Sequence, residues 1–179
     1  MPKLKNYEIK TPIDGIKDVN LVIGNLSKRL GNYKFSVQNQ KDIYYKINTG
    51  RLKLRIINGK TGELIHYIRK ETKKIRVSNY SICKINDGEN LHNILSKIFN
   101  VNVIVEKHRK IYIFGNIRIH LDKVKNLGEF LEFEVVYTDF KEARKQMKFL
   151  IESFNLDRRK FINYSYSDLL LNKQNKKGS

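Results

Sequence analysis

Residues 50–59 read Gly-Arg-Leu-Lys-Leu-Arg-Ile-Ile-Asn-Gly, an alternation of charged and apolar side chains that ends in a turn signal. Successive side chains of a strand point to opposite faces of a sheet, so Arg51, Lys53 and Arg55 share one face and the leucines share the other. Asn58-Gly59 is the dipeptide typical of a tight hairpin turn. These residues therefore predict a two-faced strand in an antiparallel sheet.

The same division into a charged and an apolar face recurs along the chain. Further turn signals occur at Asn48-Thr49-Gly50, Gly115-Asn116 and Asn126-Leu127-Gly128, as expected of hairpin connections. A single strand of this kind is explained equally well by one solvated face. The repetition favours a closed antiparallel eight-stranded β-barrel, a tunnel with a charged lumen. The other charged faces are Asn6, Glu8 and Lys10; Lys107 and Arg109; Arg118, His120 and Asp122; and Glu132 and Glu134.

Three segments have the apolar spacing of amphipathic helices, which we expect to pack outside the barrel. They cover Ile16 to Leu30, Leu91 to Ile98, and Phe140 to Phe154. Asp139 followed by Glu142 resembles a capping box for the last of them. The fold class is therefore mainly β, of the α+β kind. We expect one domain over residues 1–171 and a basic, disordered tail over residues 172–179.

Charge, hydropathy and cysteine content limit the kinds of partner and the cellular environment to be expected of this protein. The chain has 36 Lys and Arg against 18 Asp and Glu, a formal charge of +18 that attracts polyanions. No apolar run approaches the roughly 18 residues of a membrane span, so we expect a cytoplasmic protein without a membrane partner. Cys83 is the single cysteine, which excludes an intrachain disulfide, and we expect its thiol to be buried and inert.

A non-catalytic polyanion or nucleic-acid binder is one interpretation of this charge. The ten Tyr and nine Phe could stack on bases. However, no RNA-recognition consensus is present and the aromatic residues fall mostly on apolar faces, where core packing explains them. Nucleic acid is therefore kept only as a weaker alternative.

The charged strands also carry an ordered set of motifs. Asn6-Tyr7-Glu8-Ile9-Lys10 resembles the Glu-x-Glu-x-Lys signature of the CYTH superfamily, with Asn6 in place of the first Glu. Ser165 to Leu170 resembles the closing segment of the class IV adenylate cyclase-like branch of that superfamily. Six segments between these two motifs follow the order of the superfamily: Gly50 to Arg55, Gly62 to Arg69, Val77 to Tyr80, Glu106 to Tyr112, Arg118 to Asp122 and Leu127 to Glu134.

The resemblance implies a triphosphate tunnel metalloenzyme that uses Mg²⁺ or Mn²⁺. Hard oxygen ligands suit either ion. The implied metal ligands are Glu8, Asp122, Glu132 and Glu134. The implied substrate-binding residues are Lys10, Lys53, Arg55, Arg69, Arg76, Lys107, Arg109 and Arg118, of which Lys10, Lys53, Arg55 and Arg109 are also implied to be catalytic. Taken singly, Arg51, Arg76 and His120 are better explained as surface charges or as members of structural ion pairs.

Two enzymatic reactions fit the resemblance. A class IV adenylate cyclase converts ATP to cyclic AMP and pyrophosphate, which is the reaction that we favour. A triphosphatase would instead hydrolyse tripolyphosphate, thiamine triphosphate or a nucleoside triphosphate. Either enzyme would act on a small-molecule triphosphate, as a monomer or a homodimer.

Overall fold

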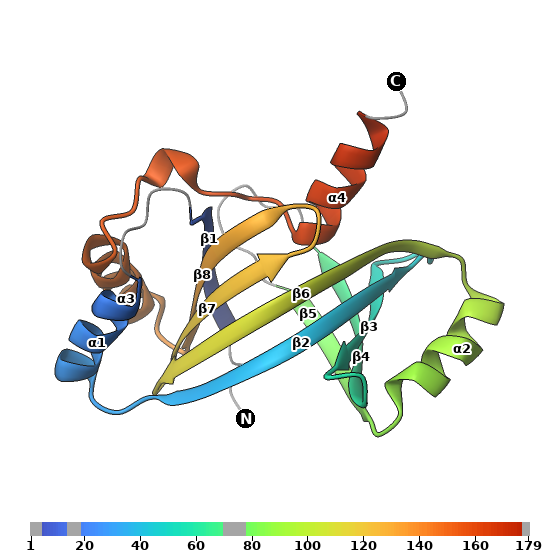
Figure 1. Cartoon of the computed structure of the whole chain (residues 1–179), viewed down its shortest axis with the longest axis horizontal. Helices are drawn as coiled ribbons and strands as arrows, with labels where there is room; N and C mark the ends of the chain where they lie inside the picture. The colour runs from blue at the N-terminus through green and yellow to red at the C-terminus, as the bar shows by residue number, and fades with distance from the viewer. Residues whose placement is uncertain (1–4, 14–18, 70–77, 177–179) are drawn as a thin grey trace. The chain divides into compact units, whose positions relative to one another are not determined.

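The computed structural model describes residues 5–13, 19–69 and 78–176. Eight strands and four α-helices follow one another along these residues (Figure 1). In chain order they are β1 (Lys5–Pro12), α1 (Val19–Leu30), β2 (Lys34–Tyr45), β3 (Arg51–Ile57), β4 (Thr61–Arg69), β5 (Ser78–Ile85), α2 (Gly88–Ile98), β6 (Val101–Phe114), β7 (Ile117–Val124), β8 (Gly128–Tyr137), α3 (Phe140–Ser153), a 3-10 turn (Arg158–Lys160) and α4 (Tyr166–Asn175).

The strands form one eight-stranded sheet in the order β1-β8-β7-β6-β2-β3-β4-β5. Antiparallel pairing joins β1 to β8, β2 to β3, β3 to β4 and β4 to β5. The predicted number of strands and the α+β class are therefore confirmed. Among the described residues the strand order begins at β1 and ends at β5 without closing, so the predicted closed barrel is not confirmed.

The predicted turns lie where the glycine and asparagine signals placed them. Asn58 and Gly59 connect β3 to β4 with φ values of 53° and 69°, and Gly115 connects β6 to β7 with a φ of 55°. Positive φ is costly for most residues and is tolerated by Gly and Asn. This local preference favours the hairpins independently of tertiary contacts.

The described residues group into two compact units. Unit 1 takes its residues from Met1–Val37, Lys110–Asp122 and Glu129–Asn163, and unit 2 from Gln38–Arg109, Lys123–Gly128 and Tyr164–Ser179. Each unit has its own apolar core, so the side chains of each are held by contacts within that unit.

The core of unit 1 is formed by α1 and α3 against the apolar faces of β1, β7 and β8 (Figure 1). Met147 and Leu150 of α3 are fully buried against residues such as Phe133 and Ile119. Asp139 caps the N-terminus of α3 by accepting a hydrogen bond from the backbone of Lys141, as predicted for a cap. Glu142, the expected second half of the capping box, forms an ion pair with Lys145 at 3.3 Å, so the cap that the structure describes is the Asp139 half of the predicted box.

The core of unit 2 is smaller, with α2 packed on β3 and β4. Leu95 packs against Leu54 and Ile56, whereas Ile94 and Ile98 are exposed. The predicted apolar stripe of α2 is therefore only partly buried, because it is wider than the contact with these short strands.

Two further expectations differ from the structure. Cys83 is exposed on β5, not buried, because β5 is the last strand in the sheet order. The first four residues of the predicted tail, 172–175, are helical because α4 continues to Asn175. None of the described helices is long and apolar enough to span a membrane.

Candidate functional site

A basic cluster of unit 2 consists of Lys53, Arg55 and Lys107 around the carboxylate of Asp42. Asp42 on β2 lies directly opposite Arg55 on β3. Arg55 donates to both oxygens of Asp42, at 2.7 and 3.0 Å, and the Nζ atoms of Lys107 and Lys53 lie 3.1 and 3.6 Å from the same carboxylate. Asp42 is 2% exposed, so these charges interact where water screens them little.

The charges of this cluster favour the ionised form of Asp42 and the neutral form of Lys53. Burial by itself raises the pKa of Asp42, but the charges of Arg55, Lys107 and Lys53 hold that pKa well below its usual value. Burial, with the positive charge of Arg55, lowers the pKa of Lys53 to about 7, and Asp42 offsets this only in part. Lys53 is therefore poised to exchange a proton near neutral pH.

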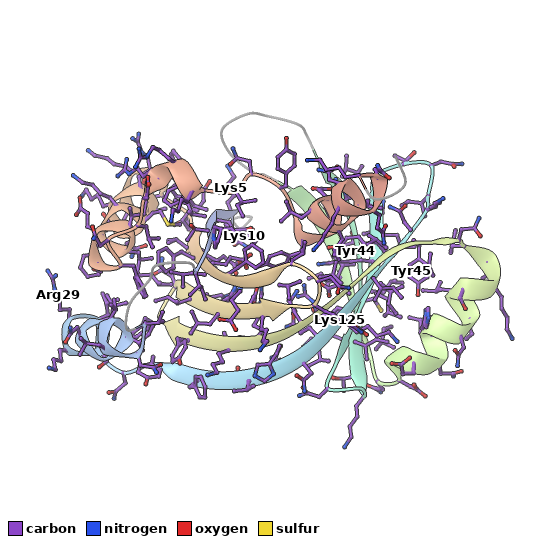
Figure 2. The ribbon with its side chains drawn as sticks, turned by 45° about the horizontal axis from the view of Figure 1, so that its top comes forward. Lys5, Lys10, Arg29, Tyr44, Tyr45 and Lys125 are labelled. Atoms are coloured by element: carbon purple, nitrogen blue, oxygen red, sulfur yellow. The ribbon has the colours of Figure 1, made fainter. Side chains whose placement is uncertain are left out.

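Aromatic rings line the basic cluster. The Nζ atoms of Lys53 and Lys107 each lie 5.7 Å from a ring centre, those of Tyr44 and Tyr166. Burial raises the pKa of Tyr44 well above its usual value, so its hydroxyl stays protonated. Figure 2 shows Tyr44 and Tyr45, consecutive residues of β2, in the view with all described side chains.

A second group of charges lies in unit 1, around Lys10 of β1. The Nζ atom of Lys10 lies 2.9 Å from Glu132 and 3.2 Å from Glu8, and Nδ1 of His120 lies 2.9 Å from the other oxygen of Glu132. Lys10, His120 and Glu132 are all buried, and Lys10 is labelled in Figure 2. The contact of His120 with Glu132 is of the kind that its sequence context indicated.

Glu134 lies beside this group on the same strand face as Glu132. It accepts a hydrogen bond from the side-chain amide of Asn6, and Nη1 of Arg118 lies 3.3 Å from it. Glu8 pairs directly opposite Glu134 in the β1–β8 register. Like charges in directly opposed positions destabilise a sheet unless a cation compensates them.

These carboxylates fit a divalent ion in chemistry. Glu8 and Glu134 offer oxygen atoms from two opposed positions, the donor type that Mg²⁺ and Mn²⁺ prefer. Glu132 fits less well, because its two oxygens already contact Lys10 and His120. Within residues 5–13, 19–69 and 78–176, no three His, Cys, Asp or Glu side chains come together as a ready metal site.

The other predicted site residues are distributed as follows. Asp122 of β7 is 1% exposed, and Arg109 of β6 is 8% exposed and close enough to lower the pKa of Lys53. Arg51 forms an ion pair with Asp168 at 2.9 Å, the kind of role expected for it. Arg69 ends β4, and Arg76 lies outside the described residues.

The sequence prediction missed Asp42 and Gln40. Both lie on the β2 face that also carries Tyr44, but the charge of Lys41 between them interrupts the period-two alternation that would have indicated them. Gln40 is 5% exposed and, among the described residues, its amide oxygen has no hydrogen-bond partner. The amide oxygen of Gln40, two residues from Asp42 on β2, is therefore a further hydrogen-bond acceptor on this face of the strand.

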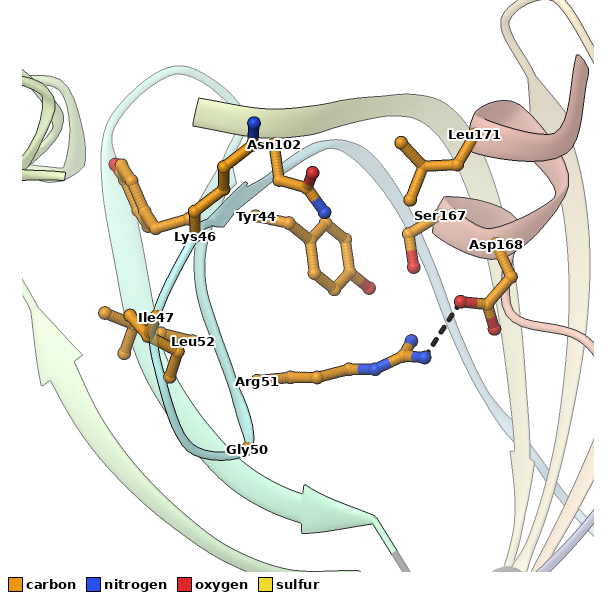
Figure 3. A pocket seen from close by; sticks show the side chains of 11 residues that line it. Tyr44, Lys46, Ile47, Gly50, Arg51, Leu52, Asn102, Ser167, Asp168 and Leu171 are labelled. Carbon is orange, nitrogen blue, oxygen red and sulfur yellow. Dashed lines mark ion pairs between the residues drawn. The ribbon is translucent and has the colours of Figure 1, made fainter. Parts of the chain in front are cut away.

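A pocket of about 290 Å³ adjoins the turn between β2 and β3 and the start of α4, all within unit 2 (Figure 3). Ser165 begins α4 with a capping box that includes Asp168. The ion pair between Arg51 and Asp168 crosses the pocket in Figure 3. Among the residues that line it are Tyr44, Arg51, Leu52, Asn102, Asp168 and Leu171.

Comparison with known proteins agrees with this architecture. A Methanocaldococcus jannaschii protein described as a "putative adenylate cyclase" is 30% identical over 178 residues, covering 90% of this chain and 96% of the relative. A solved Pyrococcus horikoshii structure has a TM-score of 0.74 at 21% identity, covering 92% of this chain and 98% of the other. A Vibrio parahaemolyticus structure with the same description as the first relative has a TM-score of 0.68 at 20% identity, covering 93% and 97%.

The two structural matches are below 25% identity and support the fold alone. The family itself is established by the CYTH domain model, which matches residues 4–164. These residues include both strand faces that carry the charged clusters. The chain belongs to the CYTH domain family.

Proposed function

We propose that this protein is a metal-dependent enzyme that acts on a triphosphate, with ATP converted to cyclic AMP and pyrophosphate as the favoured reaction. The observation that carries the proposal is the basic cluster of unit 2. Burial, with the positive charge of Arg55, lowers the pKa of Lys53 to about 7, and the buried cations of the cluster would stabilise a polyanion that enters. The description of the Methanocaldococcus jannaschii relative as an adenylate cyclase supports the choice of reaction.

The side chains of the basic cluster have distinct roles in this proposal. Arg55, already oriented by two hydrogen bonds to Asp42, would bind phosphate oxygens with a preformed geometry. Lys53 would accept the proton of the attacking ribose hydroxyl, because an amine with a pKa near 7 works as a base at neutral pH. Lys107 and Arg109 would neutralise charge on the phosphate chain.

Within unit 1, Glu8 and Glu134 would hold a divalent ion, which would supply Lewis acidity. Arg118 contacts Glu134 and Lys10 contacts Glu8, so both carboxylates keep a compensating charge without the ion. Asp122 remains a proposed ligand of the same ion. Glu132, through its contacts with Lys10 and His120, would hold the Lys10 side chain in place within unit 1.

Hydrolysis of a triphosphate is the second candidate. It is favoured by the basic cluster itself, which needs only a phosphate chain as its ligand. Water would then attack the terminal phosphorus in place of the ribose hydroxyl attacking the α-phosphorus.

A product assay separates these reactions. ATP, tripolyphosphate and thiamine triphosphate are each incubated with the protein and Mg²⁺ or Mn²⁺, and products are separated by chromatography. Cyclic AMP with pyrophosphate identifies the cyclase, and orthophosphate identifies the triphosphatase. Absence of every product with both ions would contradict the enzymatic proposal.

The metal role has its own test. Glu134→Gln should lower turnover at least roughly 10- to 100-fold, the loss that follows even from removing an outer hydrogen-bond partner of a metal ligand. The matched control is Glu152→Gln on α3, where the carboxylate is 61% exposed and pairs with Lys148 at 3.7 Å. Unchanged turnover in Glu134→Gln would remove Glu134 from the proposed metal site.

A further inference from the structure

Gln40 is a buried polar side chain that has no part in the proposed reaction. It lies on β2 two residues from Asp42 and on the same strand face, so the two side chains are roughly 7 Å apart along the strand. Gln40 is 5% exposed, and no group in the part of the chain that the structure describes donates a hydrogen bond to its amide oxygen. A buried acceptor without a donor is costly, so a ligand that supplies a donor there would gain binding free energy.

The orientation of the Gln40 amide is fixed by Gln38. The Nε2 atom of Gln40 donates a hydrogen bond of 2.6 Å to the side-chain oxygen of Gln38. This contact uses the nitrogen end of the amide and leaves the oxygen end for another partner. A rotated amide would lose the contact with Gln38, so Gln40 presents an acceptor to a ligand and not a donor.

The surroundings of Gln40 favour an anion. The carboxylate of Asp42 is contacted by Arg55, Lys53 and Lys107. Gln40 and Lys107 are also among the residues that line a second cavity of unit 2, of about 490 Å³, so there is room for a small anion beside them. The charged residues of this lining are mostly basic: Lys41, Lys107, Lys123 and Lys125 against Glu89 and Glu106.

A buried acceptor among cations distinguishes between anions of the same shape. The oxygen atoms of sulfate only accept hydrogen bonds, so a sulfate oxygen against the Gln40 oxygen would leave two acceptors without a donor. Inorganic phosphate near neutral pH keeps a proton on at least one oxygen, and a terminal phosphate group with a second pKa of about 6 keeps one for part of the time. Such a P–OH group can donate to Gln40 while the other oxygens accept from the cations.

We propose that Gln40 is a specificity-determining residue of the phosphate site, whose amide oxygen accepts a hydrogen bond from the P–OH group of a phosphate bound at the basic cluster. The inference rests on the proposed function, because it concerns the phosphates that the basic cluster would bind. It goes beyond that function by naming what the site recognises, a protonated terminal phosphate, and by predicting that anions without a donor bind poorly.

The test compares phosphate with sulfate by calorimetric titration at pH 6.5 and constant ionic strength. Wild type should bind phosphate about tenfold more tightly than sulfate, the effect of one buried acceptor left without a donor. Gln40→Met keeps a side chain of similar length and removes the acceptor, so it should bind both anions with similar affinity. The matched control is Gln174→Met, an exposed glutamine of α4 in the same unit, which should keep the wild-type preference.

Gln38→Ala tests the orientation of the amide without changing Gln40. Loss of the Gln38 oxygen lets the Gln40 amide rotate and present its nitrogen, so the preference for phosphate over sulfate should fall. If Gln40→Met does not fold, Gln38→Ala decides alone: a lost preference supports the inference, and an unchanged preference contradicts it.

Titration with tripolyphosphate separates this inference from the proposed function. If wild type binds tripolyphosphate but does not prefer phosphate to sulfate, the Gln40 oxygen does not meet the ligand and the inference is wrong while the phosphate site stands. The same conclusion follows if the preference survives in Gln40→Met. If wild type binds no tripolyphosphate, the proposed function fails and the inference fails with it.

Discussion

Asp42 is the residue on which the basic cluster depends. Its carboxylate contacts Arg55, Lys107 and Lys53, and all four side chains are largely removed from water. Removing one member of a buried ionic group leaves the others poorly compensated. The stability of unit 2 therefore depends in part on the negative charge of Asp42.

Asp42→Asn should lower the free energy of unfolding by about 3–5 kcal/mol, the usual cost of breaking a buried ion pair on one side. Urea denaturation of the whole chain measures this. The control is Glu89→Gln, because Glu89 is 47% exposed and pairs with Lys41 at 3.5 Å, a surface pair whose loss costs about 0–1 kcal/mol. Equal stability of Asp42→Asn and wild type would contradict the account of the cluster.

Lys53 makes stability depend on pH. Its pKa is about 7 in the folded protein against a usual value of 10.5, so between these pH values the unfolded chain binds more protons. Stability must then rise with pH across that window. Below pH 7 a protonated Lys53 lies among Arg55, Lys107 and Arg109 and is destabilising, with Asp42 as partial compensation.

Lys53→Met should therefore be more stable than wild type below pH 7, and its advantage should shrink as the pH rises toward 9.5. Urea unfolding of both proteins at pH 6 and pH 9.5 measures the difference. A constant difference between the two proteins across this range would mean that Lys53 keeps its proton and cannot serve as a base near neutral pH.

The sequence predicted Lys53 and Arg55 because apolar residues flank each of them. Asp42 was not predicted, because Lys41 beside it is also charged and conceals the alternation. The structure separates the two: Lys41 pairs with Glu89 of α2, while Asp42 lies on the opposite face with Lys53. Which of two neighbouring charges becomes buried depends on strand register, because a shift of one residue moves every side chain of the strand to the other face.

At the scale of elements, the β2–β3 turn is under tighter constraint than the β3–β4 hairpin. A Cβ added at Gly50 would lie 2.8 Å from the carbonyl oxygen of Tyr67 and 2.9 Å from Nε2 of His66, and its φ is +76°. Gly59 has a similar φ of +69°, but nothing lies within 4 Å of an added Cβ. Both positions require Gly conformationally, and only Gly50 also requires its small size.

Gly50→Ala should consequently lower the melting temperature more than Gly59→Ala. Each pays about 1 kcal/mol for the left-handed conformation, and Gly50→Ala adds displacement of the β4 backbone. Thermal unfolding followed by circular dichroism compares them. Equal melting temperatures would show that the β2–β3 turn relaxes without cost.

The sequence predicted which segments are strands, turns or helices better than it predicted where these elements end and which side chains are exposed. The four turn signals and the helical spacing of α2 and α3 depend on local preferences, and these were confirmed. Helix α4, which was not among the three predicted helices, and the exposure of Cys83 and Ile98 depend on what packs against them, which periodicity does not report. Tertiary contacts decide such cases.

In the molecule as a whole, some of the side chains that contribute to the formal charge of +18 are buried and not on the surface. Lys10, Lys107 and Arg109 are each less than 10% exposed, so these cations contribute to defined clusters in place of a diffuse positive surface. Composition alone indicated a polyanion partner. The burial of these charges is what favours a compact phosphate compound over a long nucleic acid.

The basic cluster should bind the triphosphate group, and calorimetric titration with tripolyphosphate measures that binding. Lys53→Met, which alters the cluster, is compared with wild type and with Lys60→Met, an exposed lysine of the β3–β4 hairpin in the same unit. We predict that wild type and Lys60→Met bind equally and that Lys53→Met binds about tenfold or more weakly at pH 6, where Lys53 is charged. Equal binding by all three proteins, or none by wild type, would contradict the account.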